Sequence, residues 1–183
     1  MPHHGRVREG LDQPGLAGLG AGVRAEWREV QEIATADAAT AWRRSRSMSD
    51  WLTARMHSGD RVAVTVGPCR FTGAVREVGS DLLALRSDEG RVDVNLAAAL
   101  PLAFAVCERS GAGGVRGGST GTFAVALNGR DGDEVRVGTL AHPEGRVGRL
   151  QVARDFVIVG AGPAELVVPI VQVAWIAPIR RDG

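Results

Sequence analysis

Lysine and tyrosine are absent from the chain, and neither sign of charge is in excess. All 22 basic residues are arginines, and 21 acidic residues leave a formal net charge of +1. The balance also holds by segment: residues 1–60 carry 8 charges of each sign, residues 61–110 carry 6 of each, and residues 111–183 carry 8 arginines and 7 acids. A nucleic-acid binder that relies on a broad basic surface is therefore disfavoured.

Cysteine and long apolar runs are also scarce. The two cysteines, Cys69 and Cys107, have no C-x-x-C spacing and no histidine pair, so we expect buried thiols in a reducing compartment. The longest apolar run, residues 97–107, is about half the length of a membrane span. The glycine-rich first 22 residues do not suit the apolar centre of a signal peptide. We therefore expect a cytoplasmic protein with no membrane partner.

The remaining composition fits a folded chain with a helical amino-terminal part. The 183 residues, 44% of them hydrophobic, suffice for one ordinary domain or two small ones. Residues 1–22 show no periodicity and predict a disordered tail. Residues 23–48 carry apolar side chains at three- and four-residue steps, which predicts an amphipathic helix. These side chains are Trp27, Val30, Ile33, Ala34, Ala38, Ala41 and Trp42.

From residue 61 the apolar period changes to two. Before it, Ser49 and Asp50 can cap a short helix that stops at Gly59. Five short strands then follow, with turns between them and spacings of 8 to 12 residues. Their apolar positions include Val62, Val64, Val66, Phe71, Val75, Val78, Leu82, Leu83, Leu85, Val92, Val94, Leu96, Leu102, Phe104 and Val106. This pattern predicts a small antiparallel barrel over residues 49–109.

A second copy of the same pattern follows a glycine-rich segment. Residues 110–121 consist mostly of glycine, serine and alanine, which is typical of a flexible linker. Residues 122–180 then repeat the earlier order at offsets of 73 to 75 residues, as for Val62 and Val135 or Asp81 and Asp155. The fold class we expect is mainly β, with an N-terminal helix and two tandem small antiparallel β-barrels.

No set of residues in the sequence indicates catalysis. His57 and His142 have no neighbouring acid or cysteine at metal-ligand spacing, and His3 and His4 fall in the expected tail. The glycine-rich stretch of residues 111–118 lacks the Gly-Lys-Ser/Thr ending of a phosphate loop. We therefore expect no enzyme, no small-molecule cofactor and no metal site.

The densest basic group is Arg43, Arg44 and Arg46, between Trp42 and Trp51. Arginines beside aromatic rings can contact phosphate while a base stacks on the ring. Alternatively, cations in the last turn of a helix complement its dipole while the tryptophans pack on a barrel. We favour the second interpretation, because no segment of the chain is basic overall.

Two segments resemble the Sm-like (LSm) small-barrel family: FTGAVREVGSDLLAL at residues 71–85 and VDVNL at residues 92–96. In that family a glycine in a bent second strand precedes the aspartate that opens the third strand, as Gly73 precedes Asp81. Residues 24–179 are also similar to uncharacterised actinobacterial tandem-barrel proteins that sometimes carry the label Fis family transcriptional regulator. No helix-turn-helix supports that label here.

The resemblance implies RNA contacts at Ser80, Asp81 and Asn95. However, the stacking aromatic and the basic loop residue of RNA-binding members have no counterpart in these loops. We therefore expect a non-enzymatic binding or assembly module that contacts a protein partner or another copy of itself. The alternative is a weak RNA- or DNA-binding regulatory protein that uses the Sm-like loops and the Arg43–Arg46 cluster.

Overall fold

The computed structural model describes residues 15–110, 113–114, 121–161 and 164–179. The chain divides into two compact units, residues 1–46 and residues 47–183. Residues 1–14 of the expected tail and most of the expected linker lie outside the described residues. No described helix is long and apolar enough to cross a membrane.

The first unit contains a single described helix, α1 (Gly15–Ser45). We expected a disordered tail through residue 22, so the helical state of residues 15–22 corrects that boundary. The glycines there are weak helix formers, but leucines and alanines alternate with them and no proline interrupts the segment. Among the side chains of this helix that the structure describes, large apolar ones are exposed: Trp27 is 72% exposed and Val30 62%.

The second unit begins with α2 (Met48–Ser58). Its N-cap is Ser47, whose hydroxyl accepts the N–H of Asp50 while the Asp50 carboxylate accepts the N–H of Ser47. This capping box replaces the Ser49 cap that we expected. The helix ends as expected at Gly59, which has a left-handed φ of 72° that favours glycine.

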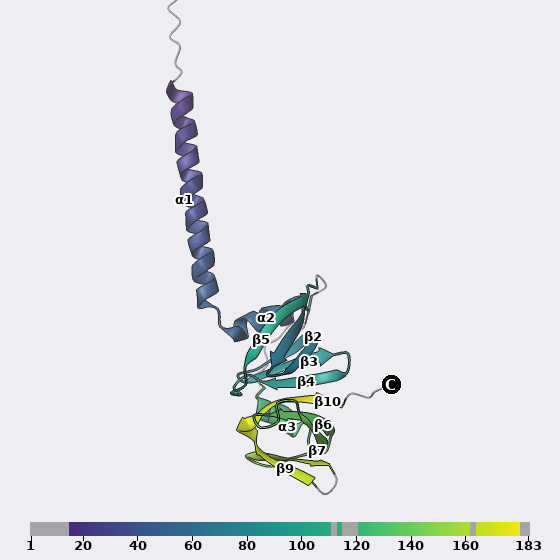
Figure 1. The fold of residues 1–183 in the computed structure, drawn as a ribbon. Helices are drawn as coiled ribbons and strands as arrows, with labels where there is room; N and C mark the ends of the chain where they lie inside the picture. The colour runs from purple at the N-terminus through teal and green to yellow at the C-terminus, as the bar shows by residue number, and fades with distance from the viewer. Residues whose placement is uncertain (1–14, 111–112, 115–120, 162–163, 180–183) are drawn as a thin grey trace, which may run out of the picture. The chain divides into compact units, whose positions relative to one another are not determined.

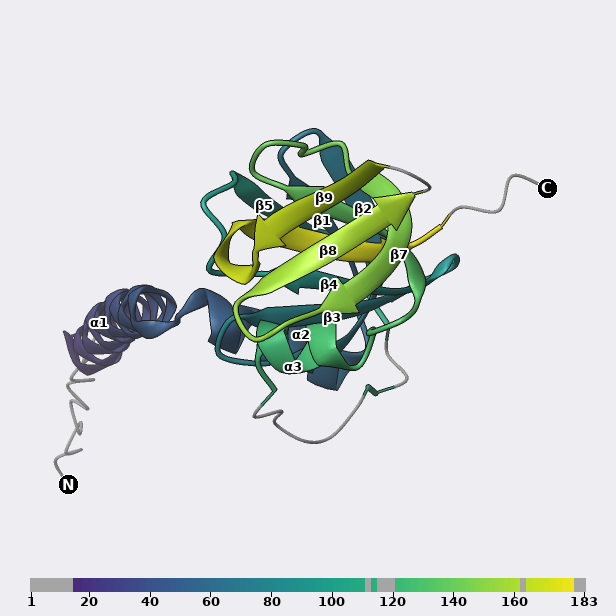
Figure 2. The same ribbon diagram turned by 90° about the horizontal axis from the view of Figure 1, so that it is seen from below.

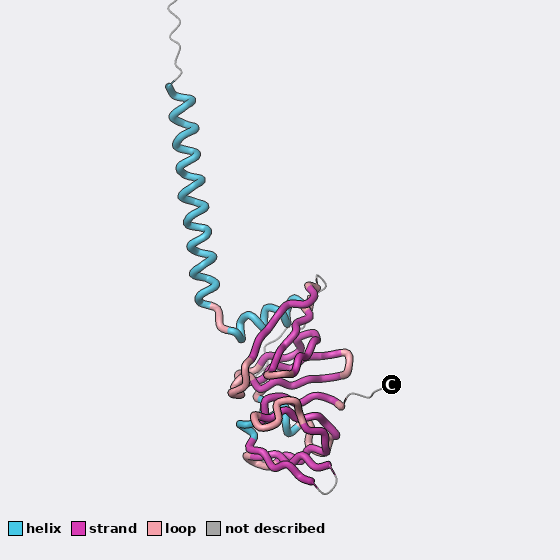
Figure 3. The backbone as a smooth tube through the Cα atoms, in the orientation of Figure 1, coloured by secondary structure: helices cyan, strands magenta, loops and turns pink. Residues whose placement is uncertain are grey.

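The other described helices of this unit are short: α3 (Phe123–Asn128) and the 3-10 turn η1 (Ile170–Gln172). Within the described residues, ten strands form one antiparallel sheet in the order β5-β1-β2-β3-β4-β10-β6-β7-β8-β9; Figures 1 and 3 show how these strands are arranged. The strands are β1 (Arg61–Val66), β2 (Cys69–Val78), β3 (Leu82–Ser87), β4 (Gly90–Asn95), β5 (Leu102–Glu108), β6 (Glu134–Thr139), β7 (Arg146–Val152), β8 (Phe156–Ala161), β9 (Ala164–Pro169) and β10 (Val173–Pro178).

The strand order repeats within the sheet. In the first half, residues 48–108, it is β5-β1-β2-β3-β4, and in the second half, residues 123–178, it is β10-β6-β7-β8-β9. The expectation of a mainly β chain with an amino-terminal helix is confirmed. Two closed barrels are not confirmed, because the strand pairings form one open series that ends at β5 and β9.

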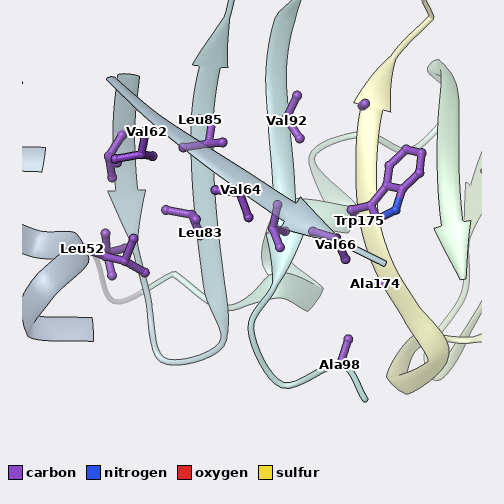
Figure 4. Close-up of a cluster of buried hydrophobic side chains, with 14 of the residues drawn as sticks. Leu52, Val62, Val64, Val66, Leu83, Leu85, Val92, Ala98, Ala174 and Trp175 are labelled. Atoms are coloured by element: carbon purple, nitrogen blue, oxygen red, sulfur yellow. The ribbon is translucent and has the colours of Figure 1, made fainter. Parts of the chain in front are cut away.

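Two hydrophobic cores lie in this unit, and each includes at least one residue from the other half. The first core contains Trp175 of β10 among side chains of the first half (Figure 4). The second core contains Leu82 of β3 beside Phe123 and Leu127 of α3. Helix α3 accordingly packs on β3 and β4 of the first half, as Figure 2 shows. The two halves therefore stabilise each other.

The cysteines differ from our expectation of two buried thiols. Cys69 is half-buried, and burial raises the pKa of its thiol. Cys107 is exposed, because it lies on the outermost strand β5 with its side chain facing away from the half-buried Leu102, Phe104 and Val106.

Candidate protein-binding edges

The two halves join through a pair of antiparallel strands, β4 and β10. Trp175 pairs with Val94, and Ile176 pairs with Asp93. Alternate residues of β10 face opposite sides, so Trp175 enters the first core while Ile176 enters the second. The junction thus combines backbone pairing with apolar burial on both faces of the sheet.

A buried carboxylate strengthens this junction. Asp93 is fully buried, and its two oxygens accept Nε of Arg91 at 2.6 Å and an Nη of Arg130 at 3.4 Å. Arg91 also contacts Glu77 at 2.9 Å. Sequence reasoning missed this cluster, because alternation with the buried Val92 and Val94 places Asp93 on the face expected to meet solvent.

Strand β9 forms one end of the sheet. There, the face that corresponds to the buried outer face of β3 and β4 in the first half is open. Val167 of β9 is 59% exposed, and Phe156 and Ile158 of the neighbouring β8 are only half-buried. The same face of the first half is closed: Leu82 and Ala84 are at most 1% exposed. There the cover consists of α3 and β10, and the structure shows no equivalent cover over β9 among its described residues.

The other end of the sheet, β5, also pairs on one side only among the described strands. Leu102 and Phe104 of β5 pack against the first core but stay half-buried, and Val106 is half-buried as well. The ring of Trp51 from α2 lies 6.3 Å from the ring of Phe104. This end therefore presents an unpaired backbone edge beside a partly exposed apolar cluster.

The predicted contacts Ser80 and Asp81 lie beside Asn95, since the Leu96 N–H donates to the Asp81 carbonyl oxygen at 2.8 Å. The Asp81 carboxylate accepts the N–H of Phe123 at 2.9 Å, which holds the start of α3. The exposed Ser80 hydroxyl lies 3.4 Å from the same carboxylate. The structure thus brings these residues together, with Asp81 engaged in a bond to the second half.

Asn95 is 5% exposed, and both ends of its side-chain amide are bonded. The amide nitrogen donates to the carbonyl of Val173 at 2.9 Å, and the amide oxygen accepts the N–H of Ala97 at 2.9 Å. The first bond joins β4 to the start of β10. The role of Asn95 as an RNA contact stays a prediction.

The predicted arginines lie at the end of α1, in the first unit. The Arg46 guanidinium stacks over the Trp42 ring at 4.0 Å, and an Nη of Arg43 donates to the Thr40 hydroxyl at 3.1 Å. Arg43 and Arg44 occupy the last turn, where cations complement the helix dipole. Trp51 belongs to the second unit and packs on Phe104.

The structure describes two of the histidines, His57 and His142. His57 is exposed at the end of α2, and His142 lies 3.8 Å from Glu144 with about a third of its side chain accessible. Among the described residues, no group of three or more His, Cys, Asp or Glu could hold a metal ion.

Comparison of the chain with protein-family models finds no matching family, and comparison with curated proteins finds no match.

Proposed function

We propose that this chain is a non-enzymatic protein-binding or assembly module made of two small Sm-like barrels. Its binding elements are the two end strands of the sheet, β5 and β9. The observation that carries the proposal is the β4–β10 junction, where an edge strand of one half pairs with an edge strand of the other. Strands β5 and β9 present edges of the same kind at the two ends of the sheet.

The open edges have the chemistry for strand addition. An end strand presents unpaired N–H and C=O groups, so an extended segment can add main-chain hydrogen bonds. Both ends also carry partly exposed apolar residues, including Phe104 and Val167. Covering apolar surface stabilises a complex by about 25 cal/mol for each Å² removed from water.

The barrel part of the proposal is supported by two glycines in equivalent strands. A Cβ at Gly73 of β2 would lie 2.6 Å from the carbonyl oxygen of Arg86 on β3. A Cβ at Gly148 of β7 would likewise collide with the carbonyl of Gly160 on β8. Such close approach of neighbouring strands is typical of the sharp bends in small barrels.

RNA binding is the alternative, and we rank it second for two reasons. The amide of Asn95 is bonded to the backbone at both ends, which leaves little capacity for a base. The charge balance of the chain also gives no broad surface for phosphates.

Retention on immobilised RNA and on protein separates the two functions. If the chain binds protein, we expect its retention on RNA to be weak and sensitive to salt. We also expect its binding to protein to be lost on Val167→Arg in β9 or on Ala103→Arg in β5. The control is Val147→Arg on β7, because Val147 is 47% exposed and lies away from both end strands.

The proposal is wrong if RNA stays bound at moderate salt and is released when Arg43, Arg44 and Arg46 become serine. It is also wrong if neither edge variant alters protein binding.

A further inference from the structure

Helix α1 exposes a row of apolar side chains along its length. Trp27 and Val30 are each more than half exposed, and Ala34, Ala38 and Ala41 are exposed as well. Most of the stability of a helix in a protein comes from packing of its apolar face. A helix of 31 residues with such a face is therefore typical of one that packs on another surface.

These five positions form a seam whose spacing reads the same in both directions. The seam has members seven and four residues before Ala34 and four and seven residues after it, namely Trp27, Val30, Ala38 and Ala41. At 3.6 residues per turn, all of them point within about 40° of the direction of Ala34. An antiparallel copy of the helix, centred on Ala34, therefore presents the same seam in the same register.

We propose that α1 pairs in antiparallel orientation with α1 of a second copy of this chain, and that the contact is this seam. The inference goes beyond the proposed function, because it uses the first unit and not the end strands of the sheet. The same surface of both copies forms the contact, so the pair is closed and two-fold symmetric.

The sizes of the side chains favour the antiparallel arrangement. In it, Trp27 of one copy faces Ala41 of the other, and Val30 faces Ala38, so each large side chain meets a small one. A parallel pair in register would place Trp27 against Trp27 and Ala41 against Ala41. That arrangement crowds one end of the seam and leaves a gap at the other, and both faults are destabilising.

The charges of α1 favour the same orientation. Residues 27–37 carry three acids and one arginine, namely Glu29, Glu32, Asp37 and Arg28. Residues 38–46 carry three arginines and no acid, namely Arg43, Arg44 and Arg46. An antiparallel copy sets the acidic part of one helix beside the basic part of the other, whereas a parallel copy in register would set like charges side by side.

Two further large apolar residues border the seam on opposite sides. Ile33 and Trp42 lie at about 100° and 80° from the direction of Ala34. Each is 56% exposed in the single copy. Pairing covers the sides of Ile33 and Trp42 that face the seam, which adds to the apolar area removed from water.

Disulfide trapping between two chains of different mass tests the orientation. Both are the full chain with Cys69→Ser and Cys107→Ser; one carries a mass tag and Val30→Cys, and the other carries Ala38→Cys. Helices that pack through alanines lie about 8 Å apart, which brings facing Cα atoms within the roughly 7 Å that a disulfide spans. After oxidation of an equal mixture, we expect disulfides between tagged and untagged chains to exceed those between like chains about fivefold or more.

The matched control pair is Glu32→Cys and Ala36→Cys. These positions lie two residues before and two residues after Ala34, so they are level with each other in the antiparallel pair, but they point away from the seam. We expect this pair to give less of the mixed disulfide by about fivefold or more.

Substitutions on the two faces of α1 test the surface. We expect the light-scattering mass of the unmodified chain to approach that of two copies at high micromolar concentration and to fall on dilution. Ala38→Arg places a charged side chain in the seam opposite Val30, so this variant should have the mass of one copy. Ala36→Arg makes the same change on the opposite face and should have the mass of the unmodified chain.

An unmodified chain that stays a single copy at high micromolar concentration overturns the inference. Disulfides mainly between like chains also overturn it, because they indicate a parallel pair, and so does an equal loss of mass with Ala38→Arg and Ala36→Arg. If Val167→Arg abolishes the association and Ala38→Arg leaves it intact, the inference is wrong and the proposed function stands. If Ala38→Arg abolishes the association while Val167→Arg and Ala103→Arg leave all protein binding intact, the inference stands and the proposed function fails.

Discussion

The indole of Trp175 packs edge-on against the ring of Phe71, with ring centroids 4.9 Å apart and planes inclined by 62°. The two rings come from different halves, since Phe71 lies on β2 and Trp175 on β10. Trp175 is fully buried, and its indole N–H has no hydrogen-bond acceptor among the described residues. Apolar packing rather than a polar bond therefore holds the ring between the halves.

Removal of this ring should destabilise the second unit strongly. We expect Trp175→Ala to lower the free energy of unfolding by about 3 to 5 kcal/mol, because it leaves a cavity between the two halves. Chemical denaturation followed by circular dichroism measures this loss. Trp27→Ala is the matched control, because Trp27 is 72% exposed and its removal should change stability by no more than about 0.5 kcal/mol. A loss below about 1 kcal/mol for Trp175→Ala would contradict the assignment of the ring to the junction.

The glycines at equivalent strand bends should be intolerant of side chains. We expect Gly73→Val and Gly148→Val each to destabilise the sheet by about 1 to 3 kcal/mol, because an added side chain collides with a neighbouring backbone carbonyl. Gly160→Ala is the control, since a Cβ there would contact only the Glu165 side chain at 3.8 Å. Thermal melting of the three variants checks this. A Gly73→Val melt that matches the unmodified chain would count against a bent β2.

The buried carboxylate of Asp93 should matter far more than an exposed one. We expect Asp93→Asn to cost about 1.5 to 3 kcal/mol, because charged hydrogen bonds to Arg91 and Arg130 are weakened in a dry environment. Asp88→Asn removes an ion pair with Arg61, but the Asp88 side chain is 85% exposed, so little change is expected. Urea denaturation of both variants provides the comparison, and equal losses would contradict the burial argument.

Alternation of apolar residues was sufficient to predict most strands. Val62, Val64 and Val66 mark β1, and Val92 and Val94 mark β4, because side chains that face a core recur with period two. The offset of 73 to 75 residues also predicted where the pattern returns, and the repeated strand order agrees with it. These features are local in the sequence, so the sequence alone reveals them.

The junction could not be predicted, because it depends on contacts between residues distant in the chain. The 3-10 turn that begins at Ile170 separates β9 from β10, and β10 pairs with β4 of the first half as well as with β6 of its own half. Ala84 and Asp93 are buried only because the second half covers the outer face of β3 and β4. No local pattern carries that information.

The carboxylate of Asp60 gives the stability of the second unit a specific acid dependence. Asp60 is 2% exposed and accepts an Nη of Arg55 at 2.8 Å and the N–H of Ser110 at 3.0 Å. The hydrogen bond from Arg55 lowers the pKa of Asp60 below its ordinary value, against the opposing effect of burial. The carboxylate therefore stabilises the folded state more than the unfolded state.

Because the pKa of Asp60 is lowered in the folded state, its carboxylate stabilises the fold at higher pH and loses that effect in acid. A group whose pKa is lower in the folded state contributes its full stabilisation above its unfolded pKa, about 3.9 for aspartate, and loses it as the pH falls through the folded value. We expect unfolding in urea to show a constant deficit for Asp60→Asn between about pH 5 and 7, and a shrinking deficit below about pH 4. The exposed Asp88→Asn variant should show no such convergence. If the Asp60→Asn deficit persists unchanged to about pH 3, ionisation of Asp60 is not what stabilises the turn between α2 and β1.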